Sequence, residues 1–412
     1  MMRVGILSLA ITLCATAAIA EPGLPPEEQV QKVLDEHPMV LAAKARTQAA
    51  RANAQALRSG PNEFTLTTSV VRRSVDLEGR FSEYDATLTR SVRLPGKARL
   101  DRAAGDFGIV AAENRAEDVK HQTAVLLADL WWDWVGAGAE EAVNLQAVDN
   151  LTRSLAGVRR RHQLRDASQL DVDQAEAALG AARLQAEQST GRIAFARARL
   201  TSQFPGLVLP ERPEELPTPM VPEGGFAALR DLVIARSHEI AAARAEASRM
   251  QALADRARRD RVADPTFGVR AFSERNGQEK GIGLIASIPL GGGHRRALAD
   301  RAASEASASA ADASAVNFNV MEMADGGLAK AQSSWEAWLR SRDGAKAQVA
   351  AVLKMRRGYD LGAIDLADLL FAERQTQDMF RLEAQARTEA LRAVTRLRID
   401  SHSLWIGGEE HE

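Results

Sequence analysis

Hydrophobic positions along the chain change their period in a fixed order. From Val30 to Leu57, and again from Leu229 to Leu253, apolar residues recur every three or four positions, which predicts an amphipathic helix in each segment. Residues 64–71 then alternate between apolar and polar, and residues 264–272 do so more weakly. This alternation predicts a strand after each helix.

A polar loop and a second strand follow each of these strands, so we expect two β-hairpins. The predicted strands cover residues 62–73, 83–94, 264–273 and 281–290. Strands of about ten residues have the length that a tilted strand needs to cross a bilayer, although a buried hairpin of a soluble protein gives the same pattern. The residues expected to turn the chain from each hairpin into the following helix are Pro95, Gly96, Gly291 and Gly292.

Two very long helices are predicted after the hairpins. No proline occurs in residues 97–161 or 294–359, and apolar residues recur there at coiled-coil spacing. At about 1.5 Å per residue each helix is roughly 100 Å long, so the two cannot belong to one compact globule. After a turn, a shorter helix returns in each half, at Leu170–Gln203 and at Leu366–Ser401.

The order helix, β-hairpin, very long helix, turn and helix therefore occurs twice. We expect a mainly α-helical fold built from two tandem structural repeats. The first repeat is predicted to cover residues 21–204 and the second residues 226–404. Between them lies a proline-rich linker, residues 205–225, and residues 405–412 form a C-terminal tail.

The N-terminus has the layout of a secretory signal peptide. An arginine precedes a short apolar stretch that ends in Ala18-Ile19-Ala20, so we expect residues 1–20 to be removed and the mature protein to lie outside the cytoplasm. The alternative is an N-terminal membrane anchor, for which this apolar run is short. The only cysteine, Cys14, lies in this segment, so we expect the mature chain to have no thiol, disulfide or lipid anchor.

Composition limits the classes of function. Of the 412 residues, 45% are hydrophobic but only 5% are aromatic, and alanine-rich stretches allow close helix contacts in place of large side chains. A formal charge of −2 gives no basic excess for a phosphate backbone, so we expect no nucleic-acid partner. After residue 20 no uncharged run is long enough for a spanning helix, so any membrane crossing would have to use strands.

No motif for catalysis, cofactor binding or metal binding is found. The sequence has no nucleophile elbow and no HExxH motif, and Gly291-Gly292-Gly293 lacks the G-x-x-x-x-G-K pattern of a phosphate loop. We therefore expect no enzyme activity, no cofactor and no metal site. The seven histidines share no ligand spacing, and we interpret His402 and His411 as solvent-exposed tail residues. The seven are His37, His121, His162, His238, His294, His402 and His411.

The second helical turn carries a more specific motif. Residues 359–372, YDLGAIDLADLLFA, resemble the helix-tip motif Y-x-x-G…D-V-L-x-A of the TolC-type outer-membrane efflux channels. The first half matches more loosely, with His162, Arg165 and Asp171 at the tyrosine, glycine and aspartate positions. The LPGKAR and LGGGHRR turns are most similar to the CzcC-like, heavy-metal branch of this family.

The resemblance implies a homotrimer in the cell outer membrane. In the family, three chains share a closed 12-stranded β-barrel, and their long helices form an α-helical barrel that extends into the periplasm. The helical turns then face the inner membrane. There, Arg165, Tyr359 and Gly362 would dock a periplasmic adaptor protein, and Asp171 and Asp368 would form the gate.

The remaining expected partners are an inner-membrane pump of the RND type and outer-membrane lipid. The implied function is export through a tripartite efflux system, with heavy-metal cations as one candidate substrate. Two alternatives remain open at this point. A periplasmic adaptor or another soluble coiled-coil scaffold would also have long helical hairpins, although adaptors have one hairpin rather than a repeated unit. A channel for drug efflux or for type I protein secretion would share the whole arrangement.

Overall fold

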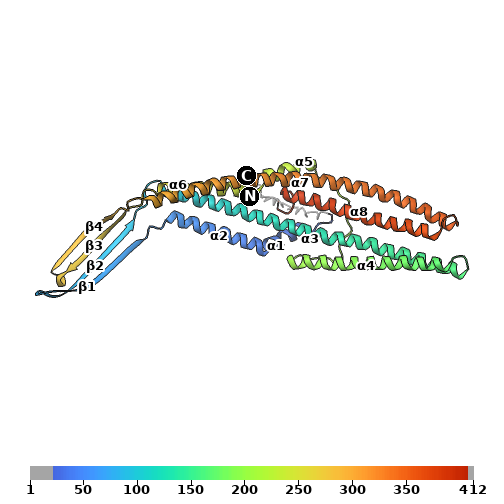
Figure 1. Cartoon of the computed structure of the whole chain (residues 1–412), viewed down its shortest axis with the longest axis horizontal. Coiled ribbons are helices and arrows are strands. Elements are labelled where there is room, and N and C mark those ends of the chain that lie inside the picture. The colour runs from blue at the N-terminus through green and yellow to red at the C-terminus, as the bar shows by residue number, and fades with distance from the viewer. Residues whose placement is uncertain (1–21, 407–412) are drawn as a thin grey trace, which may run out of the picture. The chain divides into compact units, whose positions relative to one another are not determined.

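The computed structural model describes residues 22–406 and is mainly helical, with one small antiparallel sheet (Figure 1). The predicted signal peptide, and residues 407–412 of the predicted tail with His411, lie outside the described residues. None of the described helices has an apolar stretch long enough to span a bilayer. The helices are α1 (Glu27–Asp35), α2 (Pro38–Ser59), α3 (Lys97–Gln163), α4 (Gln169–Gln203), α5 (Gly225–Ala235), α6 (His238–Arg259), α7 (Gly293–Asp360) and α8 (Leu366–Asp400). The strands are β1 (Phe64–Val75), β2 (Gly79–Ser91), β3 (Thr266–Glu274) and β4 (Glu279–Ser287), with a short 3-10 turn, η1 (Arg275–Gly277), between the last two.

The predicted fold class is confirmed. Helices, a hairpin, a very long helix, a turn and a returning helix occur in the same order twice, with α3 and α7 as the long helices and α4 and α8 as the returning ones. The alanine-rich composition fits this outcome, because alanine has the highest helix propensity and allows helices to pack closely.

The first helix of each repeat differs from the prediction, because a break divides it. Residues 30–57 belong to α1 and α2, and residues 229–253 belong to α5 and α6. At the first break Pro38 begins α2, and the His37 side chain accepts a hydrogen bond from Met39 N–H at 3.3 Å. At the second, Ser237 Oγ accepts from Ile240 N–H at 3.2 Å. Each break is thus a new helix start with its own N-cap, which the apolar spacing does not reveal.

The chain divides into two compact units, which we describe separately. The turn unit holds the described residues up to Val33, Leu130–Pro219 and Trp338–Thr388, and so contains both helical turns. The sheet unit holds Leu34–Asp129, Met220–Ala337 and the described residues from Glu389 onward.

Each unit has its own apolar core. In the turn unit, side chains of α3 and α4 pack together with the first residue of α8, and the buried members of this cluster are Leu151, Leu155, Val158, Val172, Ala175, Leu179, Ala182 and Leu366. In the sheet unit, α5 packs on α7 and α8, and the buried members are Phe226, Leu229, Val233, Ala324, Ala331, Ala393 and Leu397. The ring centroids of Phe226 and Trp335 lie 6.3 Å apart, edge to face.

The two hairpins join into one sheet in the order β1-β2-β3-β4, with every pair antiparallel (Figure 1). Strands β2 and β4 begin and end earlier than predicted. Pairing continues to Val75 and Gly79, so most of the predicted first loop belongs to the hairpin. At the other end β2 finishes at Ser91, where Val92 N–H donates to Pro265 O at 2.8 Å and Leu94 N–H donates to a side chain, Asp264 Oδ1, at 2.9 Å.

Candidate functional site

One face of the sheet is apolar and exposed. The strand register places the same-facing residues of all four strands side by side, and the large apolar side chains among them are between 46% and 90% exposed. They are Phe64, Leu66, Val70, Tyr84, Leu88, Phe267, Val269, Ile282 and Leu284. An exposed apolar surface of this kind marks an interaction with lipid or with another protein. We call these nine residues the apolar face.

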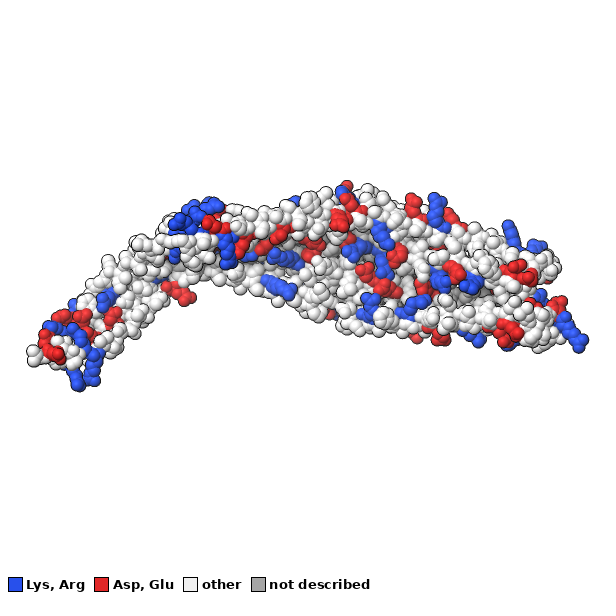
Figure 2. Space-filling model, in the orientation of Figure 1, with Lys and Arg blue, Asp and Glu red and all other residues white. Residues whose placement is uncertain are grey.

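Charged residues bound the apolar face at both ends. Arg72 and Lys280 lie on the same side of the sheet near the hairpin turns, and Arg90 lies at the end near the helices, where its guanidinium is 4.7 Å from the centroid of the Phe64 ring. From Phe64 to Val70 the apolar band extends about 20 Å at roughly 3.3 Å per residue. In Figure 2, charged side chains gather near the hairpin turns and are sparse over the middle of the strands.

The opposite face of the sheet is mainly polar. It carries threonine and serine from β1, including Thr65, Thr67 and Ser69, and the ion pair between Asp85 and Arg270. The sheet is therefore amphipathic. Its outer strands β1 and β4 each pair on one side only among the described residues, so both retain an open edge of unpaired backbone groups.

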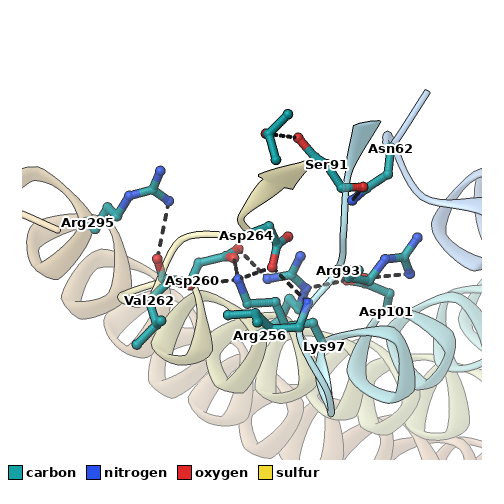
Figure 3. A network of polar contacts seen from close by, with 12 residues as sticks. Asn62, Ser91, Arg93, Lys97, Asp101, Arg256, Asp260, Val262, Asp264 and Arg295 are labelled. Atoms are coloured by element: carbon teal, nitrogen blue, oxygen red, sulfur yellow. Dashed lines mark hydrogen bonds and ion pairs between the residues drawn. The ribbon is translucent and has the colours of Figure 1, made fainter. Parts of the chain in front are cut away.

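A network of charged residues fixes the place where the strands meet the helices (Figure 3). Lys97, the first residue of α3, is only 1% exposed, and its Nζ lies 2.8 Å from each of three oxygens: Val262 O, Asp260 Oδ1 and Asp264 Oδ1. Because Asp264 also accepts the hydrogen bond from Leu94 N–H, this network ties the chain entering α3 to the loop before β3.

A second part of the same network involves arginine. Asp101 accepts from Arg93 Nη1 at 3.0 Å and from Arg256 Nε at 2.8 Å, and Arg256 also pairs with Asp260. Burial raises the pKa of the Asp260 carboxyl, but the hydrogen bonds from Arg256 and Lys97 outweigh it and leave the pKa below its ordinary value. Asp260 is therefore charged at neutral pH and contributes stability that is lost as the pH falls through its lowered pKa.

The expected turns from sheet to helix lie beside this network. Gly96 has a φ of +86°, a left-handed conformation that glycine adopts at low cost, and α3 begins at the next residue. Pro95 precedes it. Gly291 and Gly292 lie between the end of β4 and the start of α7.

Replacing Lys97 by methionine is expected to lower the free energy of unfolding by about 3 kcal/mol, because it removes the buried cation shared by two carboxylates and leaves Asp264 without an ion pair among the described residues, while Asp260 keeps Arg256. We take the low end of the range for a broken buried pair, since the carboxylates of Asp260 and Asp264 are partly exposed. Loss of helical circular dichroism with urea in detergent measures the change. The matched control is Lys44→Met, whose pair with Asp35 is exposed, and it should shift stability by no more than about 0.5 kcal/mol.

The first helical turn ends α3 with a left-handed residue. Asp166 N–H donates to Arg161 O at 2.8 Å, and Arg165 N–H donates to His162 O at 2.9 Å. This pair of hydrogen bonds is the Schellman motif, which requires a left-handed residue after the helix. Arg165 fills that position with a φ of +62°. The arginine therefore takes the conformation usually reserved for glycine.

The second helical turn has the same backbone at the end of α7. Ala363 N–H donates to Gly358 O at 2.8 Å, and Gly362 N–H donates to Tyr359 O at 3.0 Å. Gly362 has a φ of +73°, and apart from Gly362 and its two chain neighbours no described atom lies within 4 Å of the position that a Cβ would occupy. The two turns thus share one geometry, with a long side chain at Arg165 and exposed backbone at Gly362.

Because an L-residue in the left-handed conformation costs about 1 kcal/mol relative to glycine, Arg165→Gly should raise the free energy of unfolding of the turn unit by about that amount. Gly362→Ala should lower it by a similar amount. Thermal loss of helical circular dichroism compares the two variants with the wild type. Equal melting temperatures in all three would contradict the assigned left-handed turns.

The two acidic residues at the turns differ in their local contacts. Asp171 closes a capping box at the start of α4, since its carboxylate accepts from Ser168 N–H at 2.7 Å and from Ser168 Oγ at 2.8 Å. In the second turn Asp365 is the cap, accepting from Asp368 N–H at 2.8 Å. The exposed carboxylate of Asp368 has no such bond among the described residues. Asp171 therefore stabilises its helix start, whereas Asp368 is available to solvent or a ligand.

Tyr359 is directed into a groove rather than toward the exposed turn. The groove, of about 410 Å³, lies in the turn unit between α3, α7 and α8. The Tyr359 ring lies 4.2 Å from the Arg161 guanidinium, and its buried hydroxyl has no hydrogen-bond partner among the described residues. On another wall, Arg356 Nη2 pairs with Glu373 Oε1 at 2.6 Å. Tyr359 thus joins the two helical hairpins, while Arg165 and Gly362 remain exposed.

The histidines include one clear correction to the sequence interpretation. His402 is only 8% exposed, and it packs against His121 and His238 in the sheet unit instead of lying in solvent. The sequence offered no sign of this cluster, because its members come from three distant segments. Within residues 22–406, no group of histidine, cysteine, aspartate or glutamate is arranged to hold a metal ion.

Solved structures provide the comparison with known proteins. No protein-family model matches the sequence, and no curated protein matches it. The outer-membrane channel OprN is 19% identical, with a TM-score of 0.77 over 92% of this chain and 90% of OprN. CusC, described for transmembrane channel formation, is 17% identical with a TM-score of 0.76, over 91% of this chain and 92% of CusC. The outer membrane protein VceC from Vibrio cholerae is 16% identical with a TM-score of 0.72, over 93% of this chain and 96% of VceC.

These proteins are channels or outer-membrane proteins rather than enzymes, and the similarity covers nearly the whole length of both chains in each comparison. It includes the helices and the sheet together. The chain therefore has the fold of these outer-membrane channels.

Proposed function

We propose that the chain is one subunit of a trimeric outer-membrane channel that exports substrate from an inner-membrane pump and a periplasmic adaptor. The observation that carries this proposal is the exposed apolar face of the sheet, with charged residues at both of its ends. A soluble adaptor or scaffold would leave these side chains in water. A lipid bilayer would cover them, and the charged ends would lie near the lipid headgroups.

The open edges of β1 and β4 support the trimer. Unpaired backbone groups are very costly inside a bilayer, so a sheet that spans one must close on itself. Four strands are too few to close, whereas three copies supply twelve, with β4 of each copy pairing with β1 of the next. In that arrangement the polar face with Thr67 and the Asp85–Arg270 pair lines the interior of the barrel.

The most direct test of transport is conductance. The purified protein, added to a planar lipid bilayer, should give discrete conductance steps. Stable insertion without conductance would contradict the channel role. A protein that remains soluble and monomeric without detergent would contradict membrane insertion itself.

The two helical turns are the proposed docking site for the adaptor. Gly362 offers exposed backbone with open space around it, and the matching turn at Arg165 presents a long cationic side chain. Since the two turns share one backbone geometry, an adaptor hairpin can meet both in the same way. Because glycine has no side chain, the adaptor can approach the turn at Gly362 more closely than the turn at Arg165.

Asp368 is the proposed gate residue, with Asp171 as a second acidic position. In a trimer, Asp368 would supply a ring of three carboxylates. Two carboxylates about 8 Å apart repel by roughly 0.5 kcal/mol in water and about 2 kcal/mol at an effective dielectric of 20, so a narrow ring should favour polyvalent cations. The exposed Phe371 lies about one turn further along α8 and adds no charge to this ring.

Asp368→Asn is expected to abolish block of the conductance by a trivalent cation added on the side of the helical turns, because the ring of charge is lost. Asp173→Asn, which changes an exposed acid just after the first turn of α4, serves as the control and should leave the block unchanged. Equal block in wild type and Asp368→Asn would mean that Asp368 is not the gate and only stabilises the start of α8 through the helix dipole.

Heavy-metal cations are the proposed substrate class. The support is the similarity of the LPGKAR and LGGGHRR turns to the CzcC-like branch. Lys97 in the first of these turns holds the junction network, so this motif also has a structural role. Growth of a deletion strain in the presence of divalent metals, and separately of a panel of drugs, decides between metal and drug substrates. Sensitivity to drugs alone would favour drug efflux and contradict the metal assignment.

A further inference from the structure

Three histidines from distant parts of the chain pack together in the sheet unit. The rings of His238 and His402 are stacked, with centroids 4.9 Å apart and planes 21° apart. The His121 ring meets His402 edge to face at 5.6 Å. All three belong to the sheet unit, and they come from α3, the start of α6 and the segment after α8.

Hydrogen bonds fix the two outer rings of this cluster. His121 Nε2 lies 2.9 Å from Asp400 Oδ1, and His238 Nδ1 lies 3.0 Å from Asn114 Oδ1. Burial lowers the pKa of His121, but its contacts with Asp118 and Asp400 outweigh burial and raise the pKa to about 9. His121 therefore carries a positive charge at neutral pH.

His402 lies between these two rings, and the nearby charge of Asp400 compensates only in small part for its burial. Burial, followed by the rings of His238 and His121, lowers the pKa of His402 to about 4. Burial likewise lowers the pKa of His238. At neutral pH both stacked rings are uncharged. A proton on His402 would add a second positive charge with its ring centroid 5.6 Å from that of His121, at a cost that grows as water is excluded.

The segment that carries His402 is held by packing and by Arg236, whose Nη1 donates to Ser401 O and to His402 O at 3.4 Å each. His402 lies just beyond α8 in a left-handed conformation with a φ of +55°, and Ser403 N–H donates to Arg398 O at 2.8 Å. This conformation is costly for a residue with a side chain. Beyond it, Leu404 and Trp405 are buried, with Trp405 only 2% exposed.

We propose that Ser401–Ile406 is a proton-operated latch, closed on α3 and α6 while the stacked rings of His238 and His402 are neutral and released when they take up protons. Both helices and the latch belong to one chain and one unit. The latch would therefore work whether or not the chain forms a channel.

The direction of the pH effect follows from His402. In the closed latch this ring binds its proton less tightly than an ordinary histidine with a pKa of 6.5. A falling pH therefore favours the released form, in the window from about 6.5 down to about 4. His121 does not oppose this, because its partners Asp118 and Asp400 lie on α3 and α8 and remain when the latch opens.

Other charged groups face the two stacked rings, and a test has to distinguish their titration from that of His238 and His402. Burial, followed by Asp118, raises the pKa of Glu239, which moves its titration toward that of the histidines. The groups are Glu117, Asp118 and His121 from α3, Arg236 before α6, Glu239 from α6, and Asp400 from α8, which is itself paired with Arg396.

Hydrogen exchange with mass spectrometry on the full-length protein tests the latch. Exchange rates of the peptide covering residues 399–406, corrected for the intrinsic effect of pH, are compared at pH 7.5 and 5.5. From an open-state pKa of 6.5 and a closed-state pKa of about 4, release should increase about tenfold. A peptide from α3 around His121 should remain protected at both pH values, which separates release from unfolding.

Variants assign the effect to the stacked pair. The tenfold ratio should disappear in His402→Gln and shrink in His238→Gln, and it should persist in His294→Gln, an exposed histidine at the start of α7, and in Glu239→Gln. A wild-type ratio below twofold would overturn the latch, and this result needs no variant to fold. A tenfold ratio that persists in His402→Gln, or that is abolished by a chelator, would also overturn it.

Discussion

Leu284→Arg is expected to prevent assembly in the membrane. Leu284 is 90% exposed in the middle of the apolar face, where the proposal places lipid. An arginine near the middle of a bilayer costs about 2–4 kcal/mol, and a trimer would carry three of them. The expected result is loss of the protein from the outer-membrane fraction and loss of detergent-resistant trimers on a gel.

The control for this variant is Thr67→Arg. The strand register pairs Leu66 across the sheet with Leu284, through Leu88 and Val269. Thr67 is the next residue after Leu66, so the side chain of Thr67 points to the opposite, polar face. An arginine there would face the interior of the barrel and should leave insertion unchanged. If Leu284→Arg inserts as well as Thr67→Arg, the apolar face does not contact lipid.

Gly362→Trp is expected to abolish efflux while trimers remain in the membrane. The indole fits sterically in the isolated chain, because the space around Gly362 is open, but it would occupy the place where the adaptor approaches. Resistance should fall to that of the deletion strain, measured by the lowest inhibitory concentration of the exported substrate.

Gly362→Ala separates adaptor docking from backbone strain. Both substitutions place an L-residue at a φ of +73°, so both carry a similar conformational cost of about 1 kcal/mol, but only tryptophan adds bulk. The alanine variant should keep its resistance. Equal loss in the two variants would mean that the turn geometry, rather than docking, supports efflux, and unchanged resistance in Gly362→Trp would remove the docking role.

The main elements of the fold could be predicted because their signals are local. Apolar spacing identified α3, α4, α7 and α8, and alternation identified the strands. Helix breaks were missed because one capping residue decides them, as at His37 and Ser237. The caps at Asp171 and Asp365 follow the same local rule and could have been predicted from Ser168 and from the turn sequence.

The missed features of the candidate sites depend on contacts between distant segments. Nothing in the sequence around Lys97 shows that Asp260 and Asp264 bury its charge. His402 looked like a tail residue because its partners lie on other helices. At Arg165 the motif alignment identified the glycine position, but the left-handed backbone of an arginine follows only from the hydrogen bonds of the turn, because local preference favours glycine there.

Disulfide cross-linking between β1 and β4 tests the closed trimer most directly. The only cysteine is Cys14, in the predicted signal peptide, so introduced thiols should react without competition in the mature protein. Thr67→Cys in β1 is combined in turn with Gly283→Cys, Ile285→Cys and Ser287→Cys in β4, all on the polar face. After oxidation in the membrane, the account predicts bands of one, two and three linked chains for at least one pair, and none larger. Unlinked monomer for all pairs, or a ladder beyond three chains, would contradict a closed ring of three subunits.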